Sequence, residues 1–196
     1  MDIIQNNLEK VNTLKNFFKI LGRKDTDREI LSTGIDNKYQ KKPEEETINI
    51  SVIQKFFEEK TQEQKIKQFG VFFCPNTIVK KRENDNVVKI NALFCDVDVK
   101  DQNQETKNII LDRILNSNIC PSIIIKTKSG FHCYWLTNEI SLEEFDRYQN
   151  TLHEYINKNF LSDLLNFDPK KNEIVTVVCD PKAKAKSCLL RVPFFL

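Results

Sequence analysis

The sequence predicts an α+β fold built on a mixed or antiparallel sheet, and three observations support this class. Residues 87–98 read as a buried strand, 104–117 carry apolar side chains at helical spacing, and 122–126 are again apolar, which is the order of a strand–helix–strand unit. A tight turn at 127–130 leads into another apolar segment, 131–136, and so short a connection joins antiparallel strands. Together these features favour an α+β arrangement over a doubly wound parallel sheet.

The N-terminal part of the chain reads as largely helical. Residues 3–21 place apolar side chains at helical spacing, and Gly22 ends that pattern. Residues 23–48 are polar and irregular, and they include the charged segment 41–46, which we expect to be an exposed linker. A second helix is expected near 51–68, where apolar residues again recur on one side.

The rest of the chain supplies the remaining elements. Residues 70–74 form an apolar segment that stops at a proline and reads as a strand, and 80–86 read as a charged turn. A capping box opens a helix near 142–160. Two further strands are expected at 173–179 and 187–193.

We expect one compact domain in two parts, a helical N-terminal part at residues 1–69 and a core at 70–196. The 196 residues are enough to bury a sizeable core. Because the segment 189–196 is unusually apolar for a natural terminus, the chain reads as a fragment of a longer protein with further domains downstream.

Composition and charge limit the possible functions. The formal net charge is +2, so a nucleic-acid partner would have to be met by a local basic patch rather than by overall charge. No apolar run approaches the roughly 18 residues of a membrane helix, and the N-terminus lacks the pattern of a signal peptide. We therefore expect a cytoplasmic protein that does not contact membranes.

Cysteine and glycine usage argues against two common kinds of site. The six cysteines include no close Cys-x-x-Cys pair, so a structural zinc site is not expected, and reduced thiols suit a cytosolic protein. With four glycines, the chain has neither a Walker A loop nor a Gly-x-Gly fingerprint. If phosphates are bound, side chains and a metal must do most of the holding.

The acidic pair Asp96 and Asp98 is the strongest functional signal. It ends an apolar strand, and alternate strand residues share one face, so the two carboxylates point the same way with Cα atoms about 6.5 Å apart. Carboxylates in that arrangement can converge on two divalent metals about 3.5–4 Å apart. The alternative is a strand that runs out into an acidic turn.

A second group of polar residues surrounds His132, just past the tight turn. Lys128 and Ser129 occupy that turn, so a cation, a hydroxyl and an imidazole lie within a few residues and can bind an anionic phosphate. The alternative is a histidine with a structural role in its strand. The other histidine, His153, lies mid-helix among polar neighbours and is expected on the surface.

A third group lies near the end of the chain. Asp180 follows an apolar strand, as the first acidic pair does, and the alternative is a plain turn residue. Lysines 182, 184 and 186 have the spacing of a solvated basic loop. Arg191 lies within an apolar strand and needs an anionic partner, such as a carboxylate or a phosphate.

Taken in order, these motifs resemble the catalytic domain of the archaeo-eukaryotic primase superfamily, in particular the primase-polymerase branch found in plasmids, phages and CRISPR-linked loci. The resemblance covers residues 70–193 and rests on GVFFCPN at 70–76, KKR at 80–82, ALFCDVD at 92–98, KSGFHCYW at 128–135, and Asp180 followed by LRVP at 190–193. The family often continues the last motif with glycine, whereas Phe194 stands there in this chain.

The resemblance implies an RRM-like catalytic core flanked by helices, in an enzyme that joins nucleotides on a DNA template. It implies that Asp96, Asp98 and Asp180 are the catalytic carboxylates and hold two Mg²⁺ or Mn²⁺ ions. Contacts to the triphosphate of an incoming NTP or dNTP are implied for Lys128, Ser129, His132 and Arg191. Contacts to a single-stranded or primed DNA template are expected from basic residues, namely Lys80, Lys81, Arg82 and the lysines of segment 182–186.

Three other functions stay open. A phosphotransferase of the haloacid-dehalogenase type also has an aspartate pair after a buried strand, although here Asp98 is followed by Val99 and Lys100 instead of a glycine-threonine turn. A metal-dependent glycosyltransferase carries such a pair but gives no role to the histidine and arginine motifs. The third is a degenerate primase-like module that only binds nucleic acid, and the presence of all three carboxylates argues against it.

Overall fold

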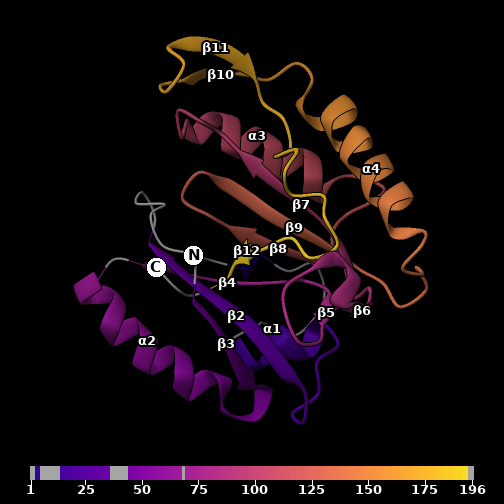
Figure 1. Ribbon diagram of the computed structural model, residues 1–196. Helices are drawn as coiled ribbons and strands as arrows, with labels where there is room; N and C mark the ends of the chain where they lie inside the picture. Colours follow the sequence, from indigo (N-terminus) through magenta and orange to yellow (C-terminus); the bar gives the residue numbers. More distant parts are fainter. Residues whose placement is uncertain (1–2, 5–13, 36–43, 68, 194–196) are drawn as a thin grey trace.

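The computed structural model describes residues 3–4, 14–35, 44–67 and 69–193, which form an α+β fold with antiparallel sheets. The predicted class is confirmed at this level. Two four-stranded sheets share one hydrophobic core, and helices cover the outer face of the first sheet (Figure 1).

The first sheet, here called sheet A, contains the predicted strand–helix–strand unit in a split form. Its antiparallel neighbours follow the order β1 (Ile3–Ile4), β8 (Ile123–Lys126), β9 (Gly130–Leu136), β7 (Ala92–Asp98). Helix α3 connects β7 to β8, and β9 returns through the tight turn to lie between them. The outer edge of β7 forms an isolated antiparallel bridge from Val97 to Cys179.

The second sheet, sheet B, corrects the prediction that residues 23–48 are irregular, because residues 28–35 and 44–48 lie in strands. Its antiparallel order is β12 (Leu190–Arg191), β4 (Phe69–Phe73), β2 (Arg28–Ile35), β3 (Glu44–Asn49). The glutamates of the expected linker that the structure describes lie in β3, while residues 41–43 lie outside the described part. β3 is an edge strand whose side chains are all exposed or half-buried. It therefore lacks the alternation of apolar residues from which a strand is predicted.

The remaining described strands form two small antiparallel pairs. β5 (Thr77–Ile78) pairs with β6 (Val87–Lys89), and β10 (Leu165–Asp168) pairs with β11 (Glu173–Thr176). The predicted strand 87–98 is therefore two strands, β6 and β7. The break between them is held by Asn76, whose side-chain oxygen accepts from the backbone N–H groups of Asn91 at 3.0 Å and Ala92 at 3.3 Å.

The helices follow the predicted positions except at the N-terminus. They are α1 (Leu14–Ile20), α2 (Ile53–Lys67), α3 (Gln104–Leu115) and α4 (Phe145–Ile156), with short helical turns at η1 (Ile50–Val52), η2 (Asn84–Asn86) and η3 (Asn157–Leu161). The helix expected over 3–21 is wrong at Ile3 and Ile4, which pair with β8, and residues 5–13 lie outside the described part. No helix of the described segments is long and apolar enough to cross a membrane.

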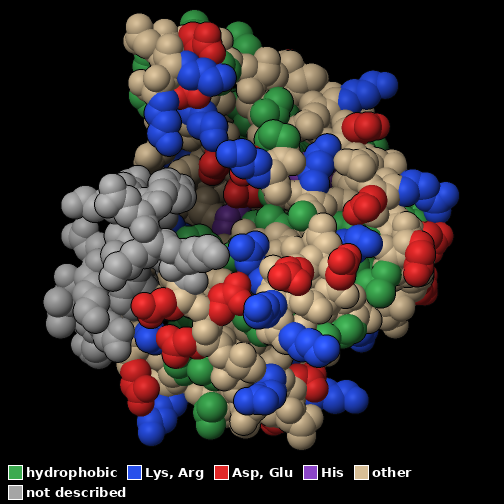
Figure 2. Space-filling model, in the orientation of Figure 1, with side chains coloured by type: hydrophobic (Ala, Val, Ile, Leu, Met, Phe, Trp, Pro, Cys, Tyr) green, Lys and Arg blue, Asp and Glu red, His purple; other side chains and the backbone are tan. Residues whose placement is uncertain are grey.

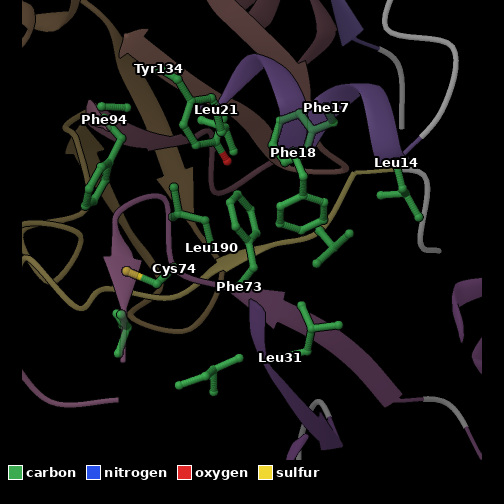
Figure 3. Close-up of a cluster of buried hydrophobic side chains, with 14 of the residues drawn as sticks. Leu14, Phe17, Phe18, Leu21, Leu31, Phe73, Cys74, Phe94, Tyr134 and Leu190 are labelled. Carbon is green, nitrogen blue, oxygen red and sulfur yellow. The ribbon is translucent and has the colours of Figure 1, made fainter. Parts of the chain in front are cut away.

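Sheet A is buried on both faces, which explains its nearly continuous apolar strands. Along β8, Ile123 and Ile125 enter the cluster shared with sheet B, whereas Ile124 enters the cluster beneath α3 and α4. Figure 3 shows the first cluster, in which the ring of Phe73 packs edge-on against Phe17 and Phe18 with centroid distances of 5.3 and 5.4 Å. Cys95, Cys133 and Cys179 are also buried, as small apolar side chains in this part of the fold.

The same alternation places the acidic pair between the two sheets. Phe94 faces the cluster shared with sheet B, and two and four residues later Asp96 and Asp98 continue on that face. The carboxylates therefore stand where the hydrophobic core between the sheets comes to an end.

The surface position predicted for His153 is wrong. Its side chain has 0% exposure, and its Nε2 lies 3.1 Å from the Phe94 carbonyl oxygen on the outer edge of β7. One helical turn earlier, the Gln149 amide donates to that carbonyl at 2.7 Å and accepts from the Phe94 N–H at 3.2 Å. These polar side chains lie on the buried face of α4 because they complete the hydrogen bonds of a sheet edge.

Candidate functional site

A cavity of about 370 Å³ opens between the two sheets and brings most of the predicted site residues together. Sheet A contributes one wall, β12 and β4 of sheet B contribute the opposite wall, and the turn between β8 and β9 closes one side. Figure 2 shows acidic and histidine side chains inside this hollow. The lining residues are Phe72, Asp96, Asp98, Thr127, Lys128, Ser129, His132, Leu189, Leu190 and Arg191.

The register of β7 against β9 sets the geometry of the acidic wall. Asp96 is directly opposite His132, and Asp98 is directly opposite Gly130. The His132 Nε2 and Asp96 Oδ1 atoms are 3.6 Å apart, which is too long for a hydrogen bond. The strands approach so closely at Gly130 that a Cβ atom there would lie 1.8 Å from the Val97 carbonyl oxygen, so only glycine fits.

The Asp96 carboxylate is destabilised in its ionised form. Burial, together with the negative charges of Asp98 and Asp180, raises the pKa of Asp96 to about 7, and Lys100 offsets only part of this effect. Its Oδ1 atom is buried and has no hydrogen-bond partner among the described residues. An acid that is both crowded by like charge and short of donors is typical of a functional site.

Asp180 lies next to this pair, on the segment that follows β11. Its backbone N–H donates to the Asp96 carbonyl oxygen at 2.7 Å, which extends the bridge between Val97 and Cys179 by one residue. Its Oδ1 accepts from the Lys182 N–H at 2.9 Å. Asp180 does not line the cavity, but its charge reaches Asp96.

The opposite side of the cavity carries positive charge and neutral donors. Burial and the positive charge of Arg191 lower the pKa of His132 to about 4, so its imidazole is neutral at pH 7. The His132 Nδ1 atom is buried and has no partner among the described residues. The Arg191 guanidinium lies over the ring of Phe72, 5.3 Å from its centroid. This stacking orients a charge that the sequence places within an apolar strand.

The basic turn is held in place by a buried lysine that no sequence motif singles out. Lys107, in the first turn of α3, is 5% exposed, and its Nζ donates to the Lys128 carbonyl oxygen at 2.7 Å. The turn is also closed from both ends. The Gly130 N–H donates to Thr127 Oγ1 at 2.9 Å, and the Val99 N–H donates to the Ser129 carbonyl oxygen at 2.8 Å.

Sequence reasoning also missed Phe72, Thr127 and the leucines before Arg191 as cavity residues. Phe72 belongs to a strand that was predicted, but strand alternation does not say which face meets the acidic wall. Thr127 opens the predicted turn, so its position could have been included. Leu189 and Leu190 read only as core residues in the sequence.

The predicted DNA-contact residues lie apart from the cavity lining. The turn with Lys80 and Lys81 is exposed, and Arg82 Nε lies 3.6 Å from Glu45 Oε1 of β3. This turn is tied to the lysine-rich loop, because the Asn84 side chain accepts from the Ser187 N–H at 3.1 Å and hydroxyl at 2.8 Å. Within that loop, the ammonium group of lysine 186 donates to the Leu142 carbonyl oxygen at 2.9 Å. The two predicted basic segments are therefore adjacent.

The carboxylates of the cavity supply only part of the ligands that a divalent cation needs. Among the described residues, no group of three or more His, Cys, Asp or Glu side chains is arranged so that it could hold a metal ion on its own. Two observations nevertheless suit a cation here, namely the buried Asp96 oxygen without a partner and the mutual repulsion of three carboxylates. Mg²⁺ and Mn²⁺ take oxygen ligands, and Mg²⁺ is usually bound by one or two carboxylates together with substrate phosphates and water. Asp96 and Asp98 therefore fit as a partial ligand set.

Comparison with known proteins found no match to a protein-family model, a curated protein or a solved structure. The family resemblance of the motifs stays a prediction. A functional assignment has to rest on the cavity and the residues around it.

Proposed function

We propose that this chain is a template-dependent nucleotidyltransferase, a DNA primase or polymerase that joins NTPs or dNTPs. The observation that carries the proposal is a cavity that has an acidic wall on β7 and basic and neutral donors on the facing side. Six of the seven residues predicted for metal and nucleotide line it, and the seventh, Asp180, bonds to the backbone of Asp96. Unrelated residues on a surface would not be expected to converge in this way.

The chain connectivity supports the same proposal. From β7 the chain runs through α3, β8, β9 and α4 to the segment that bridges Val97 at Cys179. If this bridging segment is counted as a fourth strand and the β10–β11 hairpin as an insertion after α4, the order corresponds to the βαββαβ arrangement of a ferredoxin-like or RRM-like sheet, with both helices on one face. The acidic pair lies on the other face, toward sheet B.

The cavity's own residues account for binding of a triphosphate. Its volume of about 370 Å³ is within the range of small-ligand sites. Lys128 and Arg191 supply positive charge, and guanidinium groups suit bidentate contacts to phosphate. Neutral His132 contributes one N–H donor and is not needed as a base.

The acidic wall is the part of the cavity that would bind the metal ions. Asp96 and Asp98, with Asp180 beside them, would hold the cations through carboxylate oxygens. When bound, two such ions activate the 3′-hydroxyl group of the primer and stabilise the leaving pyrophosphate. No nucleophilic side chain is required, which agrees with the burial of Cys95, whose pKa lies well above its ordinary value because of the neighbouring Cys133 thiol and burial.

The proposal is tested by primer extension on a DNA template with Mn²⁺ or Mg²⁺. The Asp96→Ala/Asp98→Ala variant should lose extension, and the exposed Asp85→Asn control should extend as the wild type does. Equal extension by the wild type and the double variant would overturn the proposal. A module that only binds DNA would bind it equally well without metal and with both aspartates removed.

A further inference from the structure

The β10–β11 hairpin presents apolar side chains to solvent. Phe167 is directly opposite Ile174, and Leu165 is directly opposite Thr176, so these four residues form one face, here called the hairpin face. Leu165 is 61% exposed, Phe167 41% and Ile174 71%. Contiguous apolar exposure of this kind usually marks an interaction site.

The turn of the protruding hairpin is closed by backbone hydrogen bonds. Asn172 takes a positive φ of 57° at the turn, and the Asp168 carbonyl oxygen accepts from the N–H groups of Lys171 at 3.2 Å and Asn172 at 2.8 Å. The inner side of the hairpin buries Asn166 and Asp168, at 4% and 7% exposure. A preorganised surface loses little conformational entropy when a partner binds.

The hairpin is anchored next to the acidic wall. The Phe167 N–H donates to Asp101 Oδ2 at 3.2 Å, and Asp101 follows Asp98 by three residues. Figure 1 shows β10 and β11 above the strands of sheet A.

Basic side chains accompany the hairpin face. Lys170 and Lys171 occupy the exposed turn, and Lys100 is exposed on the loop that leads to Asp101. Figure 2 shows basic side chains gathered between the hollow and the top of the molecule. Lys171 also lies 3.6 Å from Glu173, but an exposed ion pair of this length is weak and a phosphate can replace it. Positive charge beside an exposed aromatic ring suits single-stranded nucleic acid.

We propose that the hairpin face is a platform for the unpaired template strand, with bases stacked on Phe167 beside Ile174 and phosphates along Lys170 and Lys171. The inference rests on the proposed nucleotidyltransferase function and adds a place for the template to it. The occupant is single-stranded DNA because the face combines a stacking ring with exposed cations, and a nucleic-acid strand presents both bases and phosphates to such a surface.

The test is the affinity of the full chain for a fluorescent oligothymidylate, measured by anisotropy over a series of salt concentrations. Phe167→Ala should weaken binding about fivefold or more, because a stacked base contributes at least about that factor, and Phe167→Tyr should retain it. Lys170→Gln and Lys171→Gln should each lower the slope of log affinity against log salt by about 0.7. Tyr148→Ala is the control, since Tyr148 is also 41% exposed but lies on α4.

Wild-type affinity in Phe167→Ala, or an equal loss in Tyr148→Ala, would overturn the inference. So would a dimer of the wild type that Phe167→Ala dissociates without changing DNA affinity, since the face would then bind a second copy. Binding of Mn²⁺ with a nucleoside triphosphate separates this failure from failure of the proposed function. Hairpin variants should leave that binding unchanged, whereas Asp96→Ala/Asp98→Ala should remove it.

Discussion

Asp96→Asn should stabilise the metal-free protein while it abolishes nucleotide transfer. Asp96 is held among like charges with a buried oxygen that has no partner among the described residues. Removing its charge relieves both the desolvation of the carboxylate and its repulsion by Asp98 and Asp180. Sites built for charged ligands commonly reduce the stability of the fold in this way.

The magnitude follows from the pKa of Asp96, which rises from 3.8 to about 7 on folding. At about 1.36 kcal/mol per pKa unit, ionisation costs the folded state up to about 4 kcal/mol. The side chain keeps 20% of its surface exposed, so solvent screening reduces this figure, and we expect a gain of about 1–3 kcal/mol. Because the folded pKa is the higher one, the stability of the wild type falls as pH rises from about 4 to 7.

The assay is urea unfolding of both proteins with a chelator present, at pH 4.5 and at pH 8. The gain of Asp96→Asn should be small at pH 4.5 and full at pH 8, and Mn²⁺ should stabilise only the wild type. Asp85→Asn, on the exposed η2 turn, should match the wild type at both pH values. An equal gain at both pH values, or a variant less stable than the wild type at pH 8, would refute the reasoning.

Three further predictions concern residues that support the site and the fold. Lys107→Met should weaken nucleotide binding about fivefold without unfolding the protein, because the Lys128 carbonyl loses its buried donor. Calorimetry measures the nucleotide affinity, and a melting curve checks that the variant is folded. Unchanged affinity would contradict this prediction. Gly130→Ala should cost about 3 kcal/mol or more of unfolding free energy because a Cβ atom collides with the Val97 carbonyl; an unchanged urea midpoint contradicts it. Arg23→Ala should cost about 3–5 kcal/mol, since Glu29 at 2.9 Å would be left buried and unpaired; a loss below about 1 kcal/mol in the same assay would show that the pair is not needed.

The sequence predicted the position of side chains best in strands that are followed by a tight turn. Period-two alternation places Asp96 and Asp98 on one face, and the tight turn returns His132 to the position opposite Asp96. Asp180 was singled out because it follows an apolar segment, and its backbone N–H donates to the Asp96 carbonyl oxygen. These features depend on local backbone geometry, which can be predicted from a single sequence.

The missed features depend on contacts between distant segments. β2 carries a buried glutamate, Glu29, which is tolerated because Arg23 pairs with it and also bonds the carbonyl oxygens of residues 74–76. His153 is buried because it lies at the edge of β7, and Lys107 because it reaches the turn after β8. In each case a polar residue is interior because of a partner that is remote in the sequence.

The most direct test of the central claim is a calorimetric titration of the wild type with a nucleoside triphosphate in the presence of Mn²⁺. We expect saturable binding at one site, which is lost with chelator and lost in Asp96→Ala/Asp98→Ala, while Asp85→Asn binds as the wild type does. Binding that persists in the double variant, or no binding by the wild type at any metal concentration, would contradict the claim that the cavity is a metal-nucleotide site.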